Sequence, residues 1–398
     1  MTAGVRPALF RSFWIGGFES ATHINRQGVR LDMLQATQHD RFVSEDYGRL
    51  PSVGIQTARD TVRWHLVEAV PGQYDFASLD QFLHAARRHQ VEVIWNLMHY
   101  GWPADLDVYS GEFVRRFASF CGATVRYLRQ HLPEARFFTP INEISFLSWA
   151  AGHVGWFHPF SNGRGDEIKR QFVRAWIAAA EAIWAENPDA RLVSVEPLIH
   201  TVPPSGRPDR GGAARQQNES QWAAWEMISG RRAPELGGHP RYLDVIGVNF
   251  YHDNQWEVPG GQKIGWHLKP RDPRWVPFNR LLRGAYERWQ RPILIAETSH
   301  VGSGRAEWIA ELTDEVILAV SGGVPLEGLC LYPIIDRFDW DNHRHWHNSG
   351  LWDYAIQPDG SFQRVLNAAY ATALRKAQAR LAAIGFGEPR AEAAIGRP

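Results

Sequence analysis

Eight short apolar or β-branched runs, each followed by a longer amphipathic stretch, constrain the fold of this chain more than any other feature. The runs span residues 12–20, 56–64, 91–100, 136–144, 190–198, 244–252, 292–300 and 327–335. Their apolarity is continuous rather than alternating, which is typical of parallel strands that are covered on both faces. Eight such strands are the number that a closed (β/α)8 barrel requires. The sequence therefore predicts an α/β fold of the TIM-barrel class.

Helical periodicity fills the intervals between these runs. Apolar residues recur at three- and four-residue spacing, as in one-sided helices, over residues 76–90, 111–131, 166–187 and 306–323. We expect one catalytic domain over residues 1–375, with residues 376–398 forming the end of a last helix and a loose tail. Two long connections rich in Trp, His, Gly and Pro, residues 145–165 and 253–280, are expected on the substrate face of the barrel.

Bulk composition excludes several classes of partner. Lys+Arg and Asp+Glu are balanced at 43 each, so no net charge attracts nucleic acid or an anionic membrane. No stretch approaches the ~18 apolar residues of a membrane span, and the first residues do not resemble a signal peptide, which favours a cytoplasmic protein. Cys121 and Cys330 each lie in an apolar run and are predicted to be free buried thiols. The sequence leaves the oligomeric state open.

Aromatic content points toward a carbohydrate partner. The chain carries 18 Trp and 17 His, and the Trp residues are spread along it, often near strand ends. Aromatic faces offer a large amphipathic surface on which a pyranose ring can stack. Large barrels bury many aromatic residues in any case, so composition alone does not decide between the two explanations.

Polar and aromatic residues follow the runs at the positions where strands would end. In a parallel barrel the carboxyl ends of all strands meet at one mouth, where the chemistry is done. The residues expected there are Glu19, His23, Arg59, Trp64, His99, Tyr100, Asn142, Glu143, Glu196, Asn249, Tyr251, Glu297, Asp336, Asp339 and Trp340. Most enzymes that cleave a glycosidic bond use two carboxyl groups that face each other across it. Glu143 and Glu297 are the candidates, and no motif supports a catalytic role for Glu196.

Three of these segments carry a specific resemblance. The chain resembles a family 1 glycoside hydrolase, a family of retaining (β/α)8 β-glycosidases, from about Phe13 to Tyr354. TPINE is similar to the family's T-x-N-E-P, which implies that Asn142 holds the sugar 2-hydroxyl and that Glu143 is the general acid/base. ILIAETS is similar to I-T-E-N-G and implies Glu297 as the nucleophile. ARDTVRW is similar to Y-R-F-S-I-S-W and implies Arg59 beside that nucleophile.

The resemblance also suggests a set of sugar-binding residues. LMHYGWP is similar to L-x-H-W-D-x-P, so His99 is expected to contact a ring hydroxyl, with Tyr100 where Trp is usual. IGVNFY is similar to I-G-x-N-Y-Y and implies Asn249 and Tyr251 near the nucleophile. SATHIN and LYPIIDRFDW correspond to S-x-Y-Q-I-E and W-S-L-L-D-N-F-E-W. They imply further sugar contacts at His23, Tyr332, Asp339 and Trp340.

Several of these positions depart from the family pattern. His23 stands in place of Gln and Asp339 in place of Glu, and both positions belong to the part of the pocket that would read the 3-, 4- and 6-hydroxyls. Ile144 and Thr298 also differ, but neither removes a catalytic group. The resemblance therefore implies a retaining hydrolase that needs no cofactor, and leaves the identity of the sugar open.

Three alternatives remain at this stage. His343, His345 and His347 alternate in NHRHWHN and could bind zinc if they lay on one strand, although a polar loop is the expected setting and no metal is predicted. A barrel that binds sugar without cleaving it is a second possibility, and it has no need for both Glu143 and Glu297. An endo-acting retaining glycanase of the same clan is the third, and it would not explain the similarity of LMHYGWP.

Overall fold

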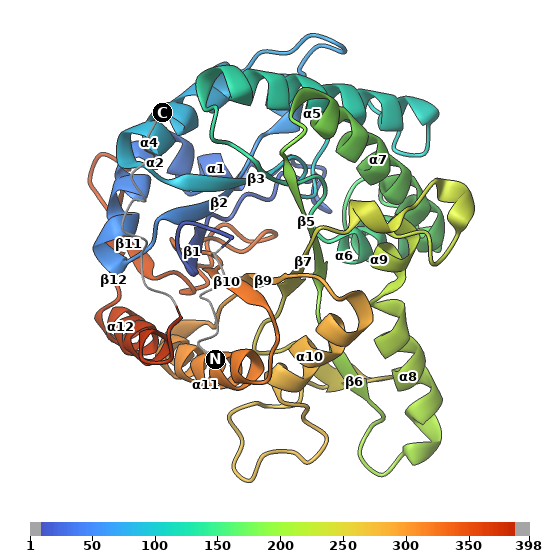
Figure 1. The fold of residues 1–398 in the computed structure, drawn as a ribbon, viewed down its shortest axis with the longest axis vertical. Coiled ribbons are helices and arrows are strands. Elements are labelled where there is room, and N and C mark those ends of the chain that lie inside the picture. Colours follow the sequence, from blue (N-terminus) through green and yellow to red (C-terminus); the bar gives the residue numbers. More distant parts are fainter. Residues whose placement is uncertain (1–8, 387–398) are drawn as a thin grey trace, which may run out of the picture.

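The computed structural model describes residues 9–386, and its centre is a closed barrel of eight parallel strands (Figure 1). The strands follow the order β1-β10-β9-β7-β5-β4-β3-β2 around the barrel. Their bounds are β1 (Trp14–Gly17), β2 (Thr57–Thr61), β3 (Glu92–Asn96), β4 (Phe137–Thr139), β5 (Arg191–Pro197), β7 (Val245–Asn249), β9 (Ile293–Thr298) and β10 (Leu326–Leu331). The predicted TIM barrel is confirmed.

The strands are shorter than the apolar runs that predicted them. Seven strands lie wholly within a predicted run, and β10 begins one residue before its run. The run at 136–144 is the clearest case, because only β4 (Phe137–Thr139) is a strand. Residues 140–143 of that run, including Asn142 and Glu143, form the turn that leads from the strand to the mouth.

Helices surround the barrel and cover the outer face of its strands (Figure 1). They are α1 (Met33–Ala36), α2 (His39–Arg49), α3 (Trp64–Val67), α4 (Ala77–His89), α5 (Gly111–His131), α6 (Ile144–Leu147), α7 (Gly165–Glu186), α8 (Gly211–Ser220), α9 (Ala223–Ile228), α10 (Phe278–Trp289), α11 (Arg305–Ser321) and α12 (Ala368–Ala382). The four predicted helices are confirmed as α4, α5, α7 and α11. No helix within residues 9–386 is long and apolar enough to cross a membrane.

The connections at the mouth contain structure that the sequence did not predict. Residues 145–165 begin with α6 and continue as a π-helical turn, η2 (Ser148–His153). Residues 253–280 contain β8 (Gln255–Glu257), which pairs with β6 (His200–Val202). A hairpin of β11 (Trp352–Ile356) and β12 (Phe362–Leu366) follows β10. Residues 387–398 of the expected tail lie outside the described residues.

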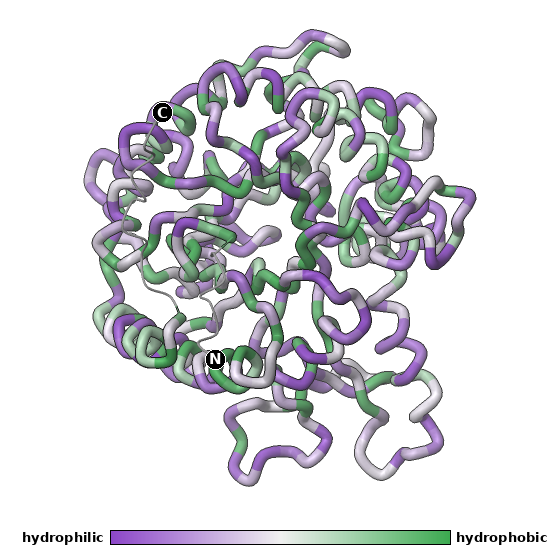
Figure 2. Tube along the Cα trace, in the orientation of Figure 1, coloured by the Kyte–Doolittle hydropathy of each residue, from purple (hydrophilic) through white to green (hydrophobic). Residues whose placement is uncertain are grey.

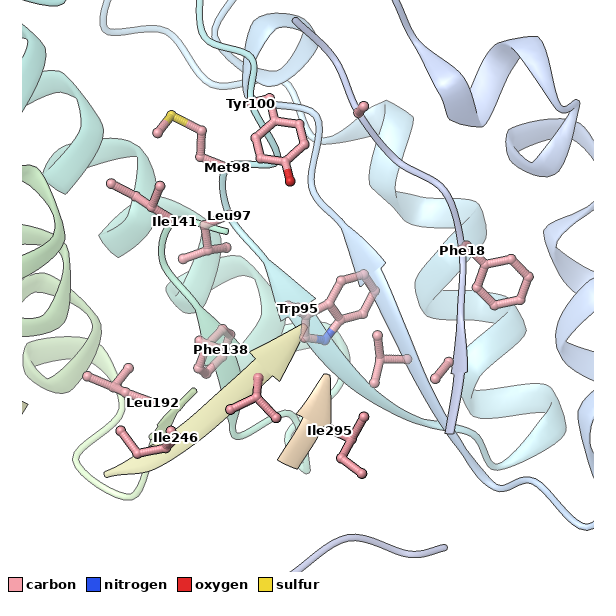
Figure 3. Close-up of a cluster of buried hydrophobic side chains, with 14 of the residues drawn as sticks. Phe18, Trp95, Leu97, Met98, Tyr100, Phe138, Ile141, Leu192, Ile246 and Ile295 are labelled. Atoms are coloured by element: carbon pink, nitrogen blue, oxygen red, sulfur yellow. The ribbon is translucent and has the colours of Figure 1, made fainter. Parts of the chain in front are cut away.

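Apolar side chains form two separate layers, inside the barrel and between the barrel and its helices. The alternation of side chains along β9 shows why, since Leu294 and Ala296 point into the barrel while Ile293 and Ile295 face the helices. Figure 2 shows the resulting apolar strands within a more polar periphery. Figure 3 shows the outer layer on four consecutive strands through Trp95, Phe138, Leu192 and Ile246. This packed scaffold fixes the positions of the strand ends.

Candidate active site

A cavity of about 380 Å³ opens at the carboxyl ends of the barrel strands. Of the residues to which the resemblance assigns a catalytic or sugar-binding role, those that line it are His99, Tyr100, Glu143, Tyr251, Glu297, Tyr332 and Trp340. A larger hollow of about 900 Å³ lies at the opposite end of the barrel, and no residue predicted for the site is among those that line it. The polar chemistry is therefore gathered at the end where TIM barrels place it.

Glu143 reaches the cavity through an unusual backbone conformation. It has φ 49° and ψ 63°, in the left-handed region that few non-glycine residues adopt. Its N–H donates to the carbonyl of Val195 on β5 at 3.0 Å, and the following residues begin α6. Such conformations occur where the surrounding structure holds them and cluster at functional sites. The turn therefore aims the Glu143 side chain into the mouth.

The carboxyl group of Glu143 is buried and held at both oxygens. The Tyr100 hydroxyl donates to Oε2, and Asn249 Nδ2 donates to Oε1 at 2.8 Å. Burial, and then the negative charge of Glu297, raises the pKa of Glu143 to about 8. The two hydrogen bonds oppose this shift. The balance leaves a carboxyl group that carries a proton at neutral pH.

An extra residue in β9 turns Glu297 toward the same cavity. Against β7, Val248 pairs with Ile295, and the next residue of β7, Asn249, pairs with Glu297, two residues further along β9. Against β10, Leu329 also pairs with Ile295, and Leu331, two residues on, pairs with Thr298, three residues further along β9. One residue of β9 is therefore unmatched on both sides, as in a β-bulge, and bulges often redirect side chains beside active sites. Ala296 and Glu297 consequently both face inward, although strict alternation would have turned Glu297 toward the helices.

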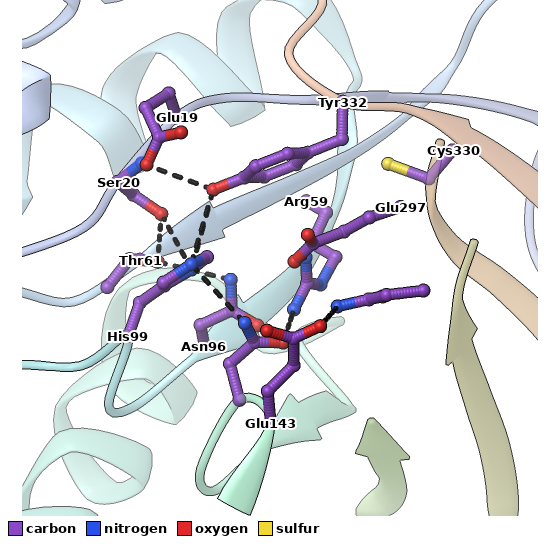
Figure 4. Close-up of polar contacts among 12 residues, drawn as sticks. Glu19, Ser20, Arg59, Thr61, Asn96, His99, Glu143, Glu297, Cys330 and Tyr332 are labelled. Carbon is purple, nitrogen blue, oxygen red and sulfur yellow. Dashed lines mark hydrogen bonds and ion pairs between the residues drawn. The ribbon is translucent and has the colours of Figure 1, made fainter. Parts of the chain in front are cut away.

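Two donors hold the carboxylate of Glu297. Arg59 Nη1 donates to Oε1 at 2.6 Å, and the Tyr251 hydroxyl donates to Oε2 at 2.7 Å. Arg59 Nη2 also donates to Asn142 Oδ1 at 2.6 Å, which fixes the amide beside Glu143. Figure 4 shows Arg59 between the Glu297 side and the Glu143 side of this network. One buried guanidinium thus couples the two halves of the carboxylate pair.

His99 continues the network toward the cavity wall. Asn142 Nδ2 lies 3.3 Å from His99 Nε2, and the Tyr332 ring stacks against the His99 ring at 5.8 Å. Burial, followed by the charge of Arg59, holds the pKa of His99 well below its usual value. His99 is therefore a neutral imidazole, which can donate one hydrogen bond and accept another.

The structure places two other predicted ligands away from the cavity lining. The His23 ring is stacked on Phe157 at 3.7 Å, and neither ring nitrogen makes a hydrogen bond within residues 9–386. Burial lowers the pKa of His23 to about 3, so the ring is neutral. Asp339 accepts hydrogen bonds from the backbone N–H groups of Asp341 and Asn342, and its Oδ2 lies 3.2 Å from His347 Nε2. Its carboxylate is therefore engaged within its own loop.

Four further residues belong to the site or support it, and two of them, Glu19 and Glu196, were expected at the mouth from the sequence but were given no role. Glu19, Arg337 and His347 line the cavity. Glu196 is buried beneath the turn of Glu143, and its Oε2 accepts the N–H of Ser145 at 3.0 Å. Burial raises the pKa of Glu196 to about 7. Glu19 and Glu196 were visible as strand-end acids, whereas Arg337 and His347 lie in a loop whose path is set by tertiary contacts.

The His-rich loop has no arrangement suited to a metal ion. His347 pairs with Asp339, and the rings of His345 and His347 are 5.5 Å apart at a steep angle. Among residues 9–386 there is no group of three or more His, Cys, Asp or Glu side chains placed to share a metal ion.

Comparison with known proteins matches the whole fold. The chain is similar to a family 1 β-glucosidase from Thermotoga maritima, with a TM-score of 0.74 and 14% identity over 94% of this chain and 98% of that one. The same enzyme in complex with methoxycarbonyl-substituted glucoimidazole gives a TM-score of 0.73 over 93% and 98% of the two chains, again at 14% identity. No protein-family model and no curated protein sequence matches the chain. At this identity the likeness establishes a shared barrel.

Proposed function

We propose that this protein is a retaining β-glycosidase that releases sugar units from the non-reducing end of β-linked glycosides. The observation that carries the proposal is the difference between its two carboxylates. Glu297 is bound to a guanidinium and a phenol, whereas the pKa of Glu143 is raised to about 8. Pairs of carboxyl groups with different environments are the basis of acid and nucleophile assignments in glycosidases.

In the first step Glu297 attacks the anomeric carbon while Glu143 acts as the acid. The bond from Glu297 to the sugar forms as the glycosidic C–O bond breaks, and the proton of Glu143 passes to the departing oxygen. The hydrogen bonds from Tyr100 and Asn249 then stabilise the Glu143 carboxylate that results. In the second step that carboxylate removes a proton from water, which attacks the glycosyl-enzyme and releases Glu297.

The remaining predicted residues receive positioning and binding roles in this proposal. Arg59 and Tyr251 hold Glu297, while Asn142 and His99 present polar groups that would contact sugar hydroxyls. Tyr332 and Trp340 supply aromatic surface at the wall of the cavity. The solved barrel of similar fold is a β-glucosidase, and it binds a substituted glucoimidazole in one of its complexes. That likeness supports a carbohydrate substrate here.

A screen of aryl β-D-glycosides that differ only in the sugar tests this function. We expect hydrolysis of at least one, with the β-anomer of the free sugar as the first product by NMR. First formation of the α-anomer would contradict the retaining mechanism. Sugar binding without turnover would instead support a non-catalytic barrel, and cleavage confined to internal linkages of polysaccharides would support an endo-acting glycanase.

A further inference from the structure

An ion pair between Glu19 and Arg337 lies in the wall of the cavity. Arg337 Nε is 3.2 Å from Glu19 Oε2, and the two side chains are 19% and 2% exposed. Glu19 follows β1 and Arg337 follows β10, which are adjacent strands. In the barrel order β10 lies four strands from β4, after which Glu143 emerges, so the pair occupies the opposite side of the mouth.

The pair retains hydrogen-bonding capacity. Arg337 Nη1 donates to the carbonyl of Phe338 at 3.0 Å, and Nη2 donates to no atom of residues 9–386. Glu19 Oε1 accepts the N–H of Ala21 at 3.1 Å. Glu19 is buried and Arg337 is partly buried, and charged groups that are withdrawn from water are normally hydrogen-bonded. The spare donors of Arg337 and the spare acceptor sites of Glu19 therefore suit a polar ligand in the cavity.

We propose that Glu19 and Arg337 form the sugar-recognition end of this cavity and select an uncharged pyranose. The carboxylate accepts from ring hydroxyls and the guanidinium donates to them. Because Glu143 protonates the departing oxygen at C1, the wall across the mouth from it, beside the strand of Glu297, meets the hydroxyls of C3, C4 or C6. This inference rests on the proposed glycosidase function. Neither residue occupies a position to which the sequence resemblance assigns sugar binding, and Asp339, which does, is engaged with its own loop.

Charge balance is the reason that the pyranose should be uncharged. Arg337 is the only Lys or Arg among the described residues that line the cavity, and Glu19 neutralises it. Arg59, behind the lining, is neutralised by Glu297. Burial, followed by the charge of Arg337, lowers the pKa of His347 to about 4, so that imidazole adds no positive charge. A sugar carboxylate or phosphate would lose its hydration without gaining a free cation.

The test compares Glu19→Gln and Arg337→Met with the control Asp244→Asn. Asp244 pairs with Arg191 at 2.6 Å near the start of β5 and β7, so its variant removes an Arg–carboxylate pair at the other end of the barrel. Circular dichroism and thermal melting confirm that each variant is folded. KM is measured for the best neutral glycoside of the aryl screen, for its 3-deoxy, 4-deoxy and 6-deoxy analogues, and for the aryl β-glucuronide.

We expect both cavity variants to raise KM for the neutral glycoside by about tenfold to 100-fold, the range for a lost hydrogen bond to a charged group. The control should leave KM unchanged. The penalty should shrink to less than about threefold on the deoxy analogue that lacks the recognised hydroxyl. Glu19→Gln frees the Arg337 cation, so kcat/KM for the glucuronide relative to the neutral glycoside should rise at least about tenfold, whereas Arg337→Met should give no such rise.

Unchanged KM in both variants, or equal losses on parent and deoxy sugars, would overturn the assignment. If the wild-type protein cleaves no glycoside, the proposed function fails. The recognition site is then tested separately, through the dissociation constants of free sugars. Tryptophan fluorescence titration with the free neutral monosaccharides and with glucuronate supplies them. Weaker binding of a neutral sugar in both variants, with gain of glucuronate binding in Glu19→Gln, supports the site, and identical dissociation constants in all proteins refute it.

Discussion

The two sides of the cavity are built differently. On the cleavage side, which comprises Arg59, Asn142, Glu143, Tyr251 and Glu297, all four carboxylate oxygens of the two glutamates accept a hydrogen bond from the protein. On the recognition side, which comprises Glu19, Tyr332, Arg337 and Trp340, the central guanidinium keeps donors without a partner in the described chain. In the proposed function, the protein itself holds the cleavage side in place for the reaction, whereas the recognition side completes its hydrogen bonds with the sugar.

This difference also matches the pattern of sequence departures. The cleavage side preserves every residue type that the resemblance assigns to catalysis. On the recognition side, His23 is buried against Phe157 and Asp339 is bound within its loop. The charged pair of Glu19 and Arg337, neither of which occupies a position to which the resemblance assigns sugar binding, lines the cavity there instead. Changes on the cleavage side should therefore affect the chemical step, and changes on the recognition side should affect the choice of sugar.

The largest expected effect follows removal of the nucleophile. Glu297→Ala should lower kcat by about 10⁴-fold to 10⁶-fold, the scale on which loss of a nucleophile or its base acts in other hydrolases. Azide fits the space left by the carboxylate and should restore turnover with formation of an α-glycosyl azide, identified by NMR. Wild-type activity in this variant would show that Glu297 is not the nucleophile, and the distinction between a cleavage side and a recognition side would then fail.

Loss of the acid should have a smaller effect that depends on the leaving group. Glu143→Ala should lower kcat by about 10²-fold to 10⁴-fold on alkyl glycosides, the usual contribution of general acid catalysis. A 2,4-dinitrophenyl glycoside needs no proton for departure, so its first step should be nearly unaffected in burst kinetics. An equal loss on both classes of substrate would contradict the acid role.

On the recognition side, Glu19→Gln should raise KM for a neutral glycoside by about tenfold to 100-fold while kcat changes less than about threefold. The reason is that Glu19 contacts the sugar away from C1, where little charge develops during the reaction. Steady-state kinetics with Asp244→Asn as the control measure this split. A loss confined to kcat would place Glu19 on the cleavage side and remove the distinction between the two sides.

The pH dependence should report the raised pKa of Glu143. The acid must be protonated for the first step, so kcat/KM should fall as pH rises through about 8, by up to tenfold for each further unit. Because the charge of Glu297 contributes to this shift, Glu297→Gln should move the Glu143 titration to lower pH, as followed by NMR of labelled glutamate. An unmoved titration would leave burial as the sole cause.

Glu196 offers the smallest and most selective effect. It accepts the Ser145 N–H beneath the left-handed turn of Glu143. Glu196→Ala should lower kcat by less than the ~100-fold that a 1 Å misplacement can cost, with little change in KM. Glu196→Gln keeps an acceptor oxygen and should recover most of the loss. If both variants lowered kcat equally, the charge of Glu196 rather than its hydrogen bond would be responsible.

The barrel and the location of Glu143 and Glu297 at its mouth could be predicted from sequence because each depends on local pattern. Continuous apolar runs marked the eight strands, and a polar residue after a run marks the mouth whatever the register. The same pattern could not predict that Glu297 faces the cavity. Strict alternation along β9 would point its side chain outward, and it faces inward because β9 contains one extra residue. The pattern also could not predict the pairing of Glu19 with Arg337, because the contact joins segments more than 300 residues apart and depends on barrel closure.

The most direct test of the whole account is covalent trapping with a 2-deoxy-2-fluoro β-glycoside that has a good leaving group, using the sugar preferred in the aryl screen. The fluorine slows both steps and the good leaving group restores the first, so the glycosyl-enzyme accumulates. We predict stoichiometric inactivation, with mass spectrometry locating the sugar on the peptide that contains Glu297. A label on Glu143 or Glu19, or tight binding with no label at all, would contradict the account.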